Sequence, residues 1–353
     1  MKKVIYIYPI ISTFVSRDQE IIKSEYILKA FEFYADSKWT LFRMFIKQFF
    51  FLVKQDKSSS VIVCQFAGFH SVLPVWFSKI SGKKILIITG GTDCVSFPSI
   101  NYGNYRGGPL KNATVYSLKN ATRISSIHEA LLFSKNTFFI REEESLQGYK
   151  HYIPDIKTPD EIIYNGYDGE RWYRDQSVLR DEIIFLTGVG KYYEKIQYLK
   201  GFDMIIQCAA ACPAAKFVIL GVNEDEKPEV FSDNVLFYPV QNREALLIWY
   251  NKATFYFQLS ISEGFPNALC ESMLCECIPI VSGVSSMPEI VEGSGFVVKK
   301  RSVEDLNAIV NKVLALKADE KENLSKRSRT AILSKYSLKN RRDKLLALIK
   351  RLS

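Results

Sequence analysis

The sequence predicts an α/β protein made of two Rossmann-like domains that face a cleft. Strand-like and helix-like segments alternate along the first half of the chain, and the same alternation begins again near residue 178. The 353 residues are enough to build two separate hydrophobic cores. We therefore expect an N-terminal domain over residues 1–178 and a C-terminal domain over residues 179–329.

The first domain is expected to alternate short apolar strands with helices. The expected strands, rich in apolar and β-branched residues, are 4–8, 61–66, 84–89, 123–127 and 137–140. The expected helices are 17–34, 71–80 and 128–134. This order is typical of parallel βαβ units.

The second domain repeats this pattern. Its expected strands are 183–187, 216–221, 235–238, 253–259 and 278–281. Its expected helices are 201–211, 242–251 and 267–276.

The composition excludes several classes of protein. Seven scattered cysteines argue against a disulfide scaffold and favour a reducing cytosol. The sequence shows neither a secretion signal nor an apolar run long enough to span a membrane, so we expect a cytoplasmic protein.

The net charge of +9 comes from the last 33 residues. Residues 321–353 contain eleven Lys or Arg and two acids, so the remaining 320 residues are neutral overall. Such a basic segment contacts nucleic acid or an anionic membrane, or is simply a solvated helix face. Tyr336 is its only aromatic residue, so we expect no nucleic-acid partner.

Residues 38–57 predict a basic amphipathic helix. Its apolar stripe is Phe42, Phe45, Ile46, Phe49, Phe50 and Val53, with Arg43, Lys47 and Lys54 opposite. Either this helix lies on an anionic membrane or its apolar face packs on the core. Together with the basic tail, the pattern favours peripheral association with the inner face of the plasma membrane.

The most informative stretch runs from Ser262 to Glu271. It places two carboxylates, Glu263 and Glu271, eight positions apart. The first lies in a loop after the strand 253–259, and the second lies in a helix that begins near Pro266. Two glutamates at this spacing also occur by chance, but a strand, a tight Gly loop and a helix start together predict a site for a phosphorylated ligand.

This stretch resembles the acidic motif of the retaining GT-B glycosyltransferases of the glycosyl transferases group 1 family, which includes glycogen-synthase-like and sucrose-synthase-like enzymes. The match continues downstream through Pro279-Ile280-Val281, Pro288-Glu289-Ile290-Val291 and Gly295-Phe296-Val297-Val298. It is strongest over 160–300, and Thr13-Phe14-Val15 resembles a bacterial surface-polysaccharide subset. The resemblance implies a GT-B fold whose last helix, within 330–353, crosses back to the first domain.

The resemblance also implies a nucleotide-diphosphate sugar, UDP- or GDP-linked, as donor. Gly190-Lys191 and Lys200-Gly201 resemble the family elements that place two cations at the diphosphate. The implied catalytic residues are Glu263, which contacts the transferred sugar, and Lys200 and Lys191. The implied donor-binding residues are Glu271, on the ribose hydroxyls, and Gly264, Phe265, Pro266, Asn267, Ala268, Gly190, Gly221 and Val240.

The implied reaction is transfer with retention to a glycan or polyprenyl-linked acceptor, with the leaving diphosphate taking the acceptor proton. No Asp-x-Asp motif occurs in the sequence, so we expect neither a metal nor a cofactor. Many relatives place a His after the strand at 84–89, where this chain has Gly90-Gly91-Thr92-Asp93. The acceptor-side candidates are Thr92, Asp93, His128 and Ser12.

The sequence leaves two alternative functions open. One is a catalytically inactive GT-B protein that binds glycans or acts as a scaffold, although Glu263 and Lys200 are both present. The other is a GT-B nucleotide-sugar epimerase, although a hydrolysing epimerase lacks this Gly-Phe-Pro-Asn context.

Overall fold

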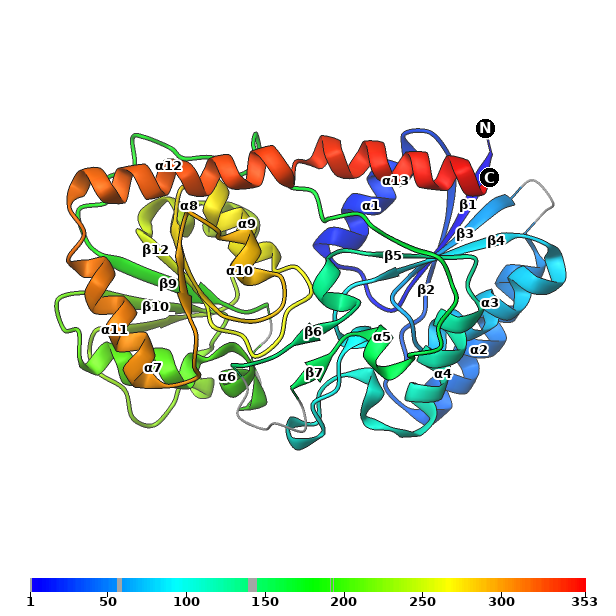
Figure 1. Cartoon of the computed structure of the whole chain (residues 1–353), viewed down its shortest axis with the longest axis horizontal. Helices are drawn as coiled ribbons and strands as arrows, with labels where there is room; N and C mark the ends of the chain where they lie inside the picture. The colour runs from blue at the N-terminus through cyan, green and yellow to red at the C-terminus, as the bar shows by residue number, and fades with distance from the viewer. Residues whose placement is uncertain (1, 56–58, 139–144, 191, 193) are drawn as a thin grey trace. The chain divides into compact units, whose positions relative to one another are not determined.

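The computed structural model describes residues 2–55, 59–138, 145–190, 192 and 194–353 (Figure 1). The chain divides into two compact units. Unit 1 comprises Met1–Ser134, Leu146–Gly166 and Leu338–Ser353, and unit 2 comprises Lys135–Ser145 and Tyr167–Ser337. The sequence placed the domain boundary at 178 and the returning helix at 330–353.

Unit 1 contains a parallel six-stranded sheet in the order β2-β1-β3-β4-β5-β8. Its strands are β1 (Lys3–Tyr8), β2 (Ile27–Glu32), β3 (Ser59–Gln65), β4 (Lys84–Thr89), β5 (Arg123–Ser126) and β8 (Asp160–Ile162). The apolar residues of β1, β3 and β4 are completely buried. Such continuous apolar strands are expected where helices cover both faces of a parallel sheet.

The helices of unit 1 come from both ends of the chain. They are α1 (Thr13–Lys23), α2 (Lys38–Val53), α3 (Phe69–Ser81), α4 (Gly108–Asn120), α5 (Tyr149–Tyr152) and α13 (Leu338–Leu352). The last of these, α13, packs against α1 and β3 (Figure 1). Arg341 of α13 donates from Nε and Nη2 to the two carboxylate oxygens of Asp18 in α1, at 2.6 and 2.5 Å. The last helix therefore belongs to the first unit.

Two predicted helices of unit 1 are wrong. The helix expected at 17–34 ends at Lys23, and residues 27–32 form the edge strand β2, which pairs in parallel with β1. None of the β2 residues is fully buried, so the strand lacks the apolar alternation that would have revealed it. The helix expected at 128–134 is only a 3-10 turn, Glu129–Leu131.

The chain after this turn also differs from the prediction. It forms a two-stranded sheet from β6 (Ser134–Lys135) and β7 (Leu146–Gln147). Of the strand expected at 137–140, residues 137 and 138 are not in a strand, and residues 139 and 140 lie outside the described residues. The two-residue β6 ends where Asn136 turns, its side chain accepting from the Phe138 N–H at 3.1 Å.

Unit 2 contains a second parallel six-stranded sheet, in the order β11-β10-β9-β12-β13-β14. Its strands are β9 (Ile184–Gly188), β10 (Lys216–Leu220), β11 (Val235–Tyr238), β12 (Phe255–Gln258), β13 (Ile278–Ser282) and β14 (Phe296–Val298). Its helices are α6 (Glu194–Lys200), α7 (Phe202–Ala210), α8 (Arg243–Lys252), α9 (Asn267–Leu274), α10 (Met287–Ile290), α11 (Val303–Leu314) and α12 (Ala318–Lys335). The predicted pair of parallel α/β domains is confirmed.

The strand order of each sheet fixes where a ligand can bind. In unit 1, β2 lies on one side of β1, and the next strand in the chain, β3, lies on the other side. The direction in which strands are added to the sheet therefore reverses at β1. In unit 2 the same reversal falls between β9 and β12. Ligands of open parallel sheets bind at the carboxyl ends of the strands beside such a reversal.

Candidate functional site

The loop between β12 and α9 is held by aromatic contacts within unit 2. The Phe265 ring stacks on Tyr167 at a centroid distance of 6.0 Å and meets the edge of Tyr336 at 4.9 Å. The Tyr167 hydroxyl donates to Asn267 Oδ1, at the first residue of α9, at 2.9 Å. Pro266 directly precedes the helix in an extended conformation. The sequence motif therefore folds into a fixed loop and a helix start.

Glu263 is the centre of a hydrogen-bond network in this loop. Its Oε1 accepts from Lys200 Nζ at 2.5 Å, from Ser260 Oγ at 2.7 Å and from Gln258 Nε2 at 3.0 Å. The Lys200 and Glu263 side chains are 26% and 16% exposed, so solvent reaches this ion pair only in part. Three donors on one oxygen orient the carboxylate and leave little freedom for its side chain.

A glycine brings Lys200 to Glu263. Lys200 is the last residue of α6, and Gly201 follows with φ +74°, in the left-handed region. A Cβ at Gly201 would lie 2.7 Å from the Leu259 carbonyl oxygen. Only glycine allows the chain to pass this close to the end of β12.

Glu271 lies on a cavity of about 170 Å³ at the carboxyl edge of the unit 2 sheet. Its side chain is buried, with 7% of the residue exposed. The cavity lies beside the reversal between β9 and β12, where a ligand is expected. Its lining comprises Thr187, Gly188, Val189, Gly190, Leu220, Val240, Gln241, Leu246, Tyr250, Tyr256, Asn267, Ala268 and Glu271.

Two tyrosines that line this cavity, Tyr250 and Tyr256, have raised pKa values. Burial raises the pKa of both Tyr250 and Tyr256, so both hydroxyls stay protonated. The carboxylates of Glu263 and Glu271 raise the pKa of Tyr256 further, and Glu271 also acts on Tyr250. Glu263 and Glu271 therefore both place negative charge near the Tyr256 hydroxyl.

The predicted donor-binding residues fall into two groups. Gly190, Val240, Asn267, Ala268 and Glu271 line the cavity.

The others, Gly264, Phe265, Pro266 and Gly221, are not among its described lining residues. Gly221 has φ +92°, and a Cβ there would lie 2.0 Å from the Val189 carbonyl oxygen, so it lets the end of β10 approach the chain after β9. Lys191, the second predicted cation, lies outside the described residues.

Unit 1 has a larger cavity, of about 570 Å³, at the carboxyl ends of β1, β2 and β3. Its lining comprises Pro9, Ile10, Phe33, Tyr34, Ala35, Asp36, Ser37, Lys38, Leu41, Phe66, Ala67, Gly68, Phe69, His70, Thr92, Asn104 and Leu110. Of the four predicted acceptor-side residues, only Thr92 is in this lining.

Asp93, the residue after Thr92, is completely buried. Its Oδ1 accepts from the N–H groups of Gly90 and Gly91 at 3.1 and 3.0 Å, and its Oδ2 accepts from Ala67 N–H at 3.1 Å. Burial raises the pKa of Asp93, and these hydrogen bonds oppose that rise. Asp93 thus ties the loop that carries Thr92 to the end of β3.

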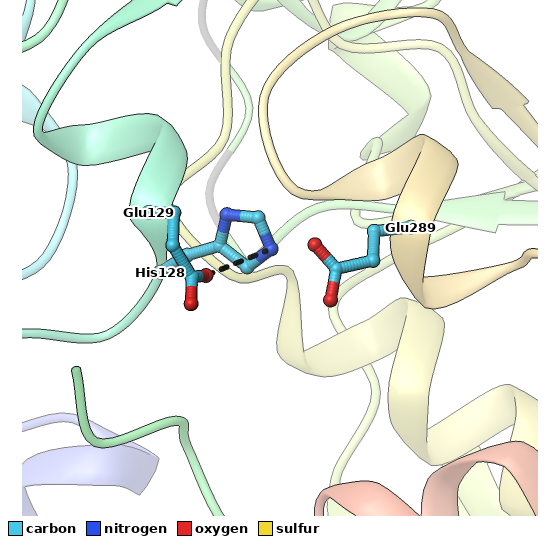
Figure 2. A group of neighbouring side chains, drawn as sticks. All are labelled: His128, Glu129 and Glu289. Atoms are coloured by element: carbon cyan, nitrogen blue, oxygen red, sulfur yellow. Dashed lines mark ion pairs between the residues drawn. The ribbon is translucent and has the colours of Figure 1, made fainter.

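The other two candidates cap short elements. Ser12 Oγ accepts from the Val15 N–H at the start of α1. The Nδ1 atom of the buried His128 accepts from the Ala130 N–H at 3.1 Å, and its Nε2 lies 3.8 Å from the Glu129 carboxylate (Figure 2). Figure 2 also draws Glu289, which belongs to α10 of unit 2.

Sequence reasoning missed His70, a buried residue in the first turn of α3 that lines the unit 1 cavity. Its Nε2 lies 2.8 Å from the Gln65 carbonyl oxygen and 3.1 Å from that of Phe66. Burial lowers the pKa of His70. A histidine two residues after a glycine at the end of a buried strand was the signal that could have revealed it.

Part of the chain matches a known protein family. Residues 188–331 match the family described as Glycosyl transferases group 1. The match covers less than half of the chain and contains Lys200, Glu263 and Glu271. No curated protein matches the chain in sequence.

Solved structures match the whole chain. Sucrose-phosphate synthase (tll1590) from Thermosynechococcus elongatus has a TM-score of 0.72 at 14% identity, covering 100% of this chain and 99% of its own. Anabaena Alr3699/HepE in complex with UDP and glucose has a TM-score of 0.71 at 11% identity, covering 99% and 100%. A glycosyltransferase from Rickettsia africae ESF-5 has a TM-score of 0.65 at 12% identity, covering 99% and 98%.

At these identities the solved structures establish the fold, which is GT-B. The group 1 match over residues 188–331 supports a glycosyltransferase. Among the described helices, none combines the length and apolar character needed to cross a membrane.

Proposed function

We propose that the protein transfers a sugar from a nucleotide-diphosphate donor to a glycan or lipid-linked acceptor, with retention at the anomeric carbon, in the synthesis of a cell-surface polysaccharide. The observation that carries this proposal is the segment from Glu263 to Glu271. It fixes Glu263 to Lys200 at one end and presents Glu271 to the unit 2 cavity at the other.

The chemistry assigned to these residues follows from their charge. A carboxylate in a cavity wall can accept hydrogen bonds from both ribose hydroxyls, which is the role proposed for Glu271. Lys200 would stabilise the negative charge that grows on the diphosphate as the glycosidic bond breaks, and Lys191 is proposed as a second cation. Glu263 would bind hydroxyls of the transferred sugar.

The proposed reaction passes through an oxocarbenium-like state. The acceptor hydroxyl attacks from the side of the leaving group, and the leaving diphosphate takes the hydroxyl proton. This sequence of steps uses neither a metal ion nor a further cofactor.

The donor base is proposed to be uracil or guanine. Anabaena Alr3699/HepE, whose fold is shared, was solved in complex with UDP-glucose, which favours testing uridine nucleotides first. An inactive scaffold protein would not require the Lys200–Glu263 ion pair. Conversion of the nucleotide sugar without transfer to an acceptor would instead indicate an epimerase.

A panel of nucleotides tests the donor site. We expect UDP and UDP-sugars, or GDP and GDP-sugars, to raise the melting temperature of the full chain. Glu271→Ala should weaken this stabilisation, whereas Glu263→Ala should keep nucleotide binding and lose transfer. Glu292→Ala removes an exposed glutamate of the same unit and is the matched control. Stabilisation by no nucleotide would contradict the proposal.

We also propose that unit 1 associates peripherally with an anionic membrane, on the inner face of the plasma membrane. Of the apolar stripe expected on α2, Phe42, Ile46, Phe49, Phe50 and Val53 are between 41% and 57% exposed, and Trp39, at 67%, extends it. The remaining member, Phe45, is half-buried and contacts Phe33 at a centroid distance of 5.3 Å. This exposure favours the membrane over the core-packing alternative. Exposed Lys38, Arg43, Lys47 and Lys54 on the same helix match the charge of anionic lipid.

A further inference from the structure

The unit 1 cavity has a predominantly apolar wall. Its large apolar side chains are Phe33, Leu41, Phe66, Phe69, Ile10 and Leu110. At about 570 Å³, it is within the size range of cavities that bury most of a small organic ligand. The donor site described above lies in unit 2 and makes no use of this cavity.

His70 supplies a polar atom of defined character in this wall. Its Nε2 lies between two carbonyl oxygens, those of Gln65 and Phe66, and a carbonyl oxygen can only accept a hydrogen bond. Nε2 therefore carries the proton. In the neutral ring, which burial favours, Nδ1 keeps its lone pair. Among the described residues, none donates a hydrogen bond to this Nδ1.

The backbone next to His70 is held in an unfavourable conformation. Phe66 has φ +67°, in the left-handed region that a bulky residue rarely adopts. Its ring occupies the space that a Cβ at Gly90 would fill, at 2.1 Å. Residues held this way concentrate at ligand sites, because the surrounding structure must keep them there.

We propose that this cavity is the acceptor site, that the acceptor is an amphiphile such as a lipid-linked sugar, and that His70 Nδ1 accepts a hydrogen bond from one of its hydroxyl groups. The inference rests on the proposed sugar transfer and chooses between its two acceptor classes. The apolar part of the acceptor packs against the phenylalanine-rich wall, and its hydroxyl donates a hydrogen bond to Nδ1 of His70.

The position of α2 supports the same class of acceptor. Lys38 and Leu41, in the first turn of α2, are part of the cavity wall. The exposed apolar stripe begins at Trp39 of that same turn. A lipid-linked acceptor held in a bilayer would therefore meet the cavity at the end of the helix that lies on the bilayer surface.

The chain has only three histidines, His70, His128 and His151, so their ring nitrogens can be followed by NMR in the full-length protein labelled with ¹⁵N-histidine. The probe is hexyl β-glucoside, and glucose is the control without an alkyl chain. We expect hexyl β-glucoside to shift the Nδ1 resonance of His70 in a saturable way and to bind at least tenfold more tightly than glucose. An unmoved His70 resonance, or equal binding of glucose, would overturn the inference.

His70→Gln separates ligand binding from folding. The glutamine side-chain N–H can still donate to the Gln65 and Phe66 carbonyls, but the Nδ1 lone pair is gone. We expect fluorescence of a dansyl-labelled hexyl glucoside to report about five- to tenfold weaker binding, as for one lost hydrogen bond. His151→Gln, at an exposed position, should bind as the parent does. Unchanged affinity in His70→Gln would overturn the role of His70.

Titration with UDP on the same samples distinguishes this inference from the proposed function. If UDP stabilises the protein and hexyl β-glucoside leaves His70 unmoved, the acceptor inference falls and the proposed function stands. If no nucleotide binds, the proposed function falls, and with it the claim that the bound amphiphile is an acceptor.

Discussion

The guanidinium of Arg301 lies over the ring of Tyr198, 3.7 Å from its centroid, and donates to both carboxylate oxygens of Asp203 at 2.8 and 2.7 Å. It also donates to the Tyr198 carbonyl at 3.1 Å. Tyr198 and Asp203 flank the turn that carries Lys200. Arg301 therefore fixes both sides of the turn, and it is not itself among the described residues that line the cavity.

Replacing Arg301 should disturb the placement of Lys200. Lysine keeps the charge but cannot pair with both Asp203 oxygens while stacking on Tyr198. We expect Arg301→Lys to lower the free energy of unfolding by about 1.5–3 kcal/mol, the range for hydrogen bonds to charged groups. The donor kcat/KM should also fall. Chemical denaturation and steady-state kinetics measure both, with the exposed Lys300→Ala as control. Parental kinetics in Arg301→Lys would contradict the positioning role.

Lys200 and Glu263 should act as one unit in kinetics. Lys200→Ala is expected to lower kcat/KM by about 10²–10³-fold, as for loss of one charge-stabilising donor. Because the two side chains form a direct ion pair, the double variant with Glu263→Ala should lose much less than the product of the single losses. Lys195→Ala, at an exposed position in the same helix, should keep activity. Full turnover in the double variant would eliminate the proposed site.

The Arg341–Asp18 pair should dominate the attachment of α13. Both side chains are at most 2% exposed, and Arg341 also donates to the carbonyls of Ile163 and Tyr164. Arg341→Ala leaves a buried carboxylate without its cation, so we expect a loss of about 3–5 kcal/mol in the free energy of unfolding. The neighbouring Arg342→Ala, at an exposed position, should change it by less than about 0.5 kcal/mol. Equal effects of the two variants would disprove this assignment.

His70 should make the stability of the protein depend on pH. Its pKa in the folded state is lowered from 6.5 by burial, so the unfolded chain binds more protons in the interval between the two values. The stabilising contribution is complete above pH 6.5 and is lost as the pH falls through the lowered pKa. We expect denaturation at a series of pH values to show this loss, and His70→Gln to reduce it. A pH profile that His70→Gln leaves unaltered would refute the prediction.

The exposed stripe of α2 should control binding to liposomes. We expect co-sedimentation with vesicles that contain phosphatidylglycerol, weaker binding in high salt, and loss of binding when Phe42, Phe49 and Phe50 are replaced by Ser. Leu179→Ser with Val230→Ser removes two residues of unit 2 that are 76% and 84% exposed and is the matched control. Binding that ignores both lipid charge and salt would rule out this association.

Much of the fold could be predicted from the sequence because the central strands are apolar throughout. β1, β3, β4 and β12 are short apolar runs between turns, and such runs identify buried parallel strands. The edge strand β2 escaped prediction because its side chains are at least partly exposed and carry no apolar alternation. Its strand conformation is set by hydrogen bonds to β1, whose paired residues lie 24 positions earlier in the sequence.

The candidate site could also be predicted only in part. The motif from Glu263 to Glu271 could be located because a loop and a helix start leave local signals. The direct contact between Lys200 and Glu263 joins residues 63 positions apart and depends on the close passage of Gly201 by Leu259, which no local pattern reports. His70 was missed because acceptor-side residues were sought after β1, β4 and β5, whereas His70 follows β3.

The route of α13 has a consequence for the order in which the protein is made. Arg341 is synthesised after the whole of unit 2, which ends at Ser337, and after every other element of unit 1. Asp18 is synthesised more than three hundred residues before its ion-pair partner, Arg341. During that interval the first unit is held together without its last helix and exposes the apolar surface that α13 will cover. A nascent chain arrested before α13 should therefore depend on chaperones through its N-terminal part, even though that part was made first.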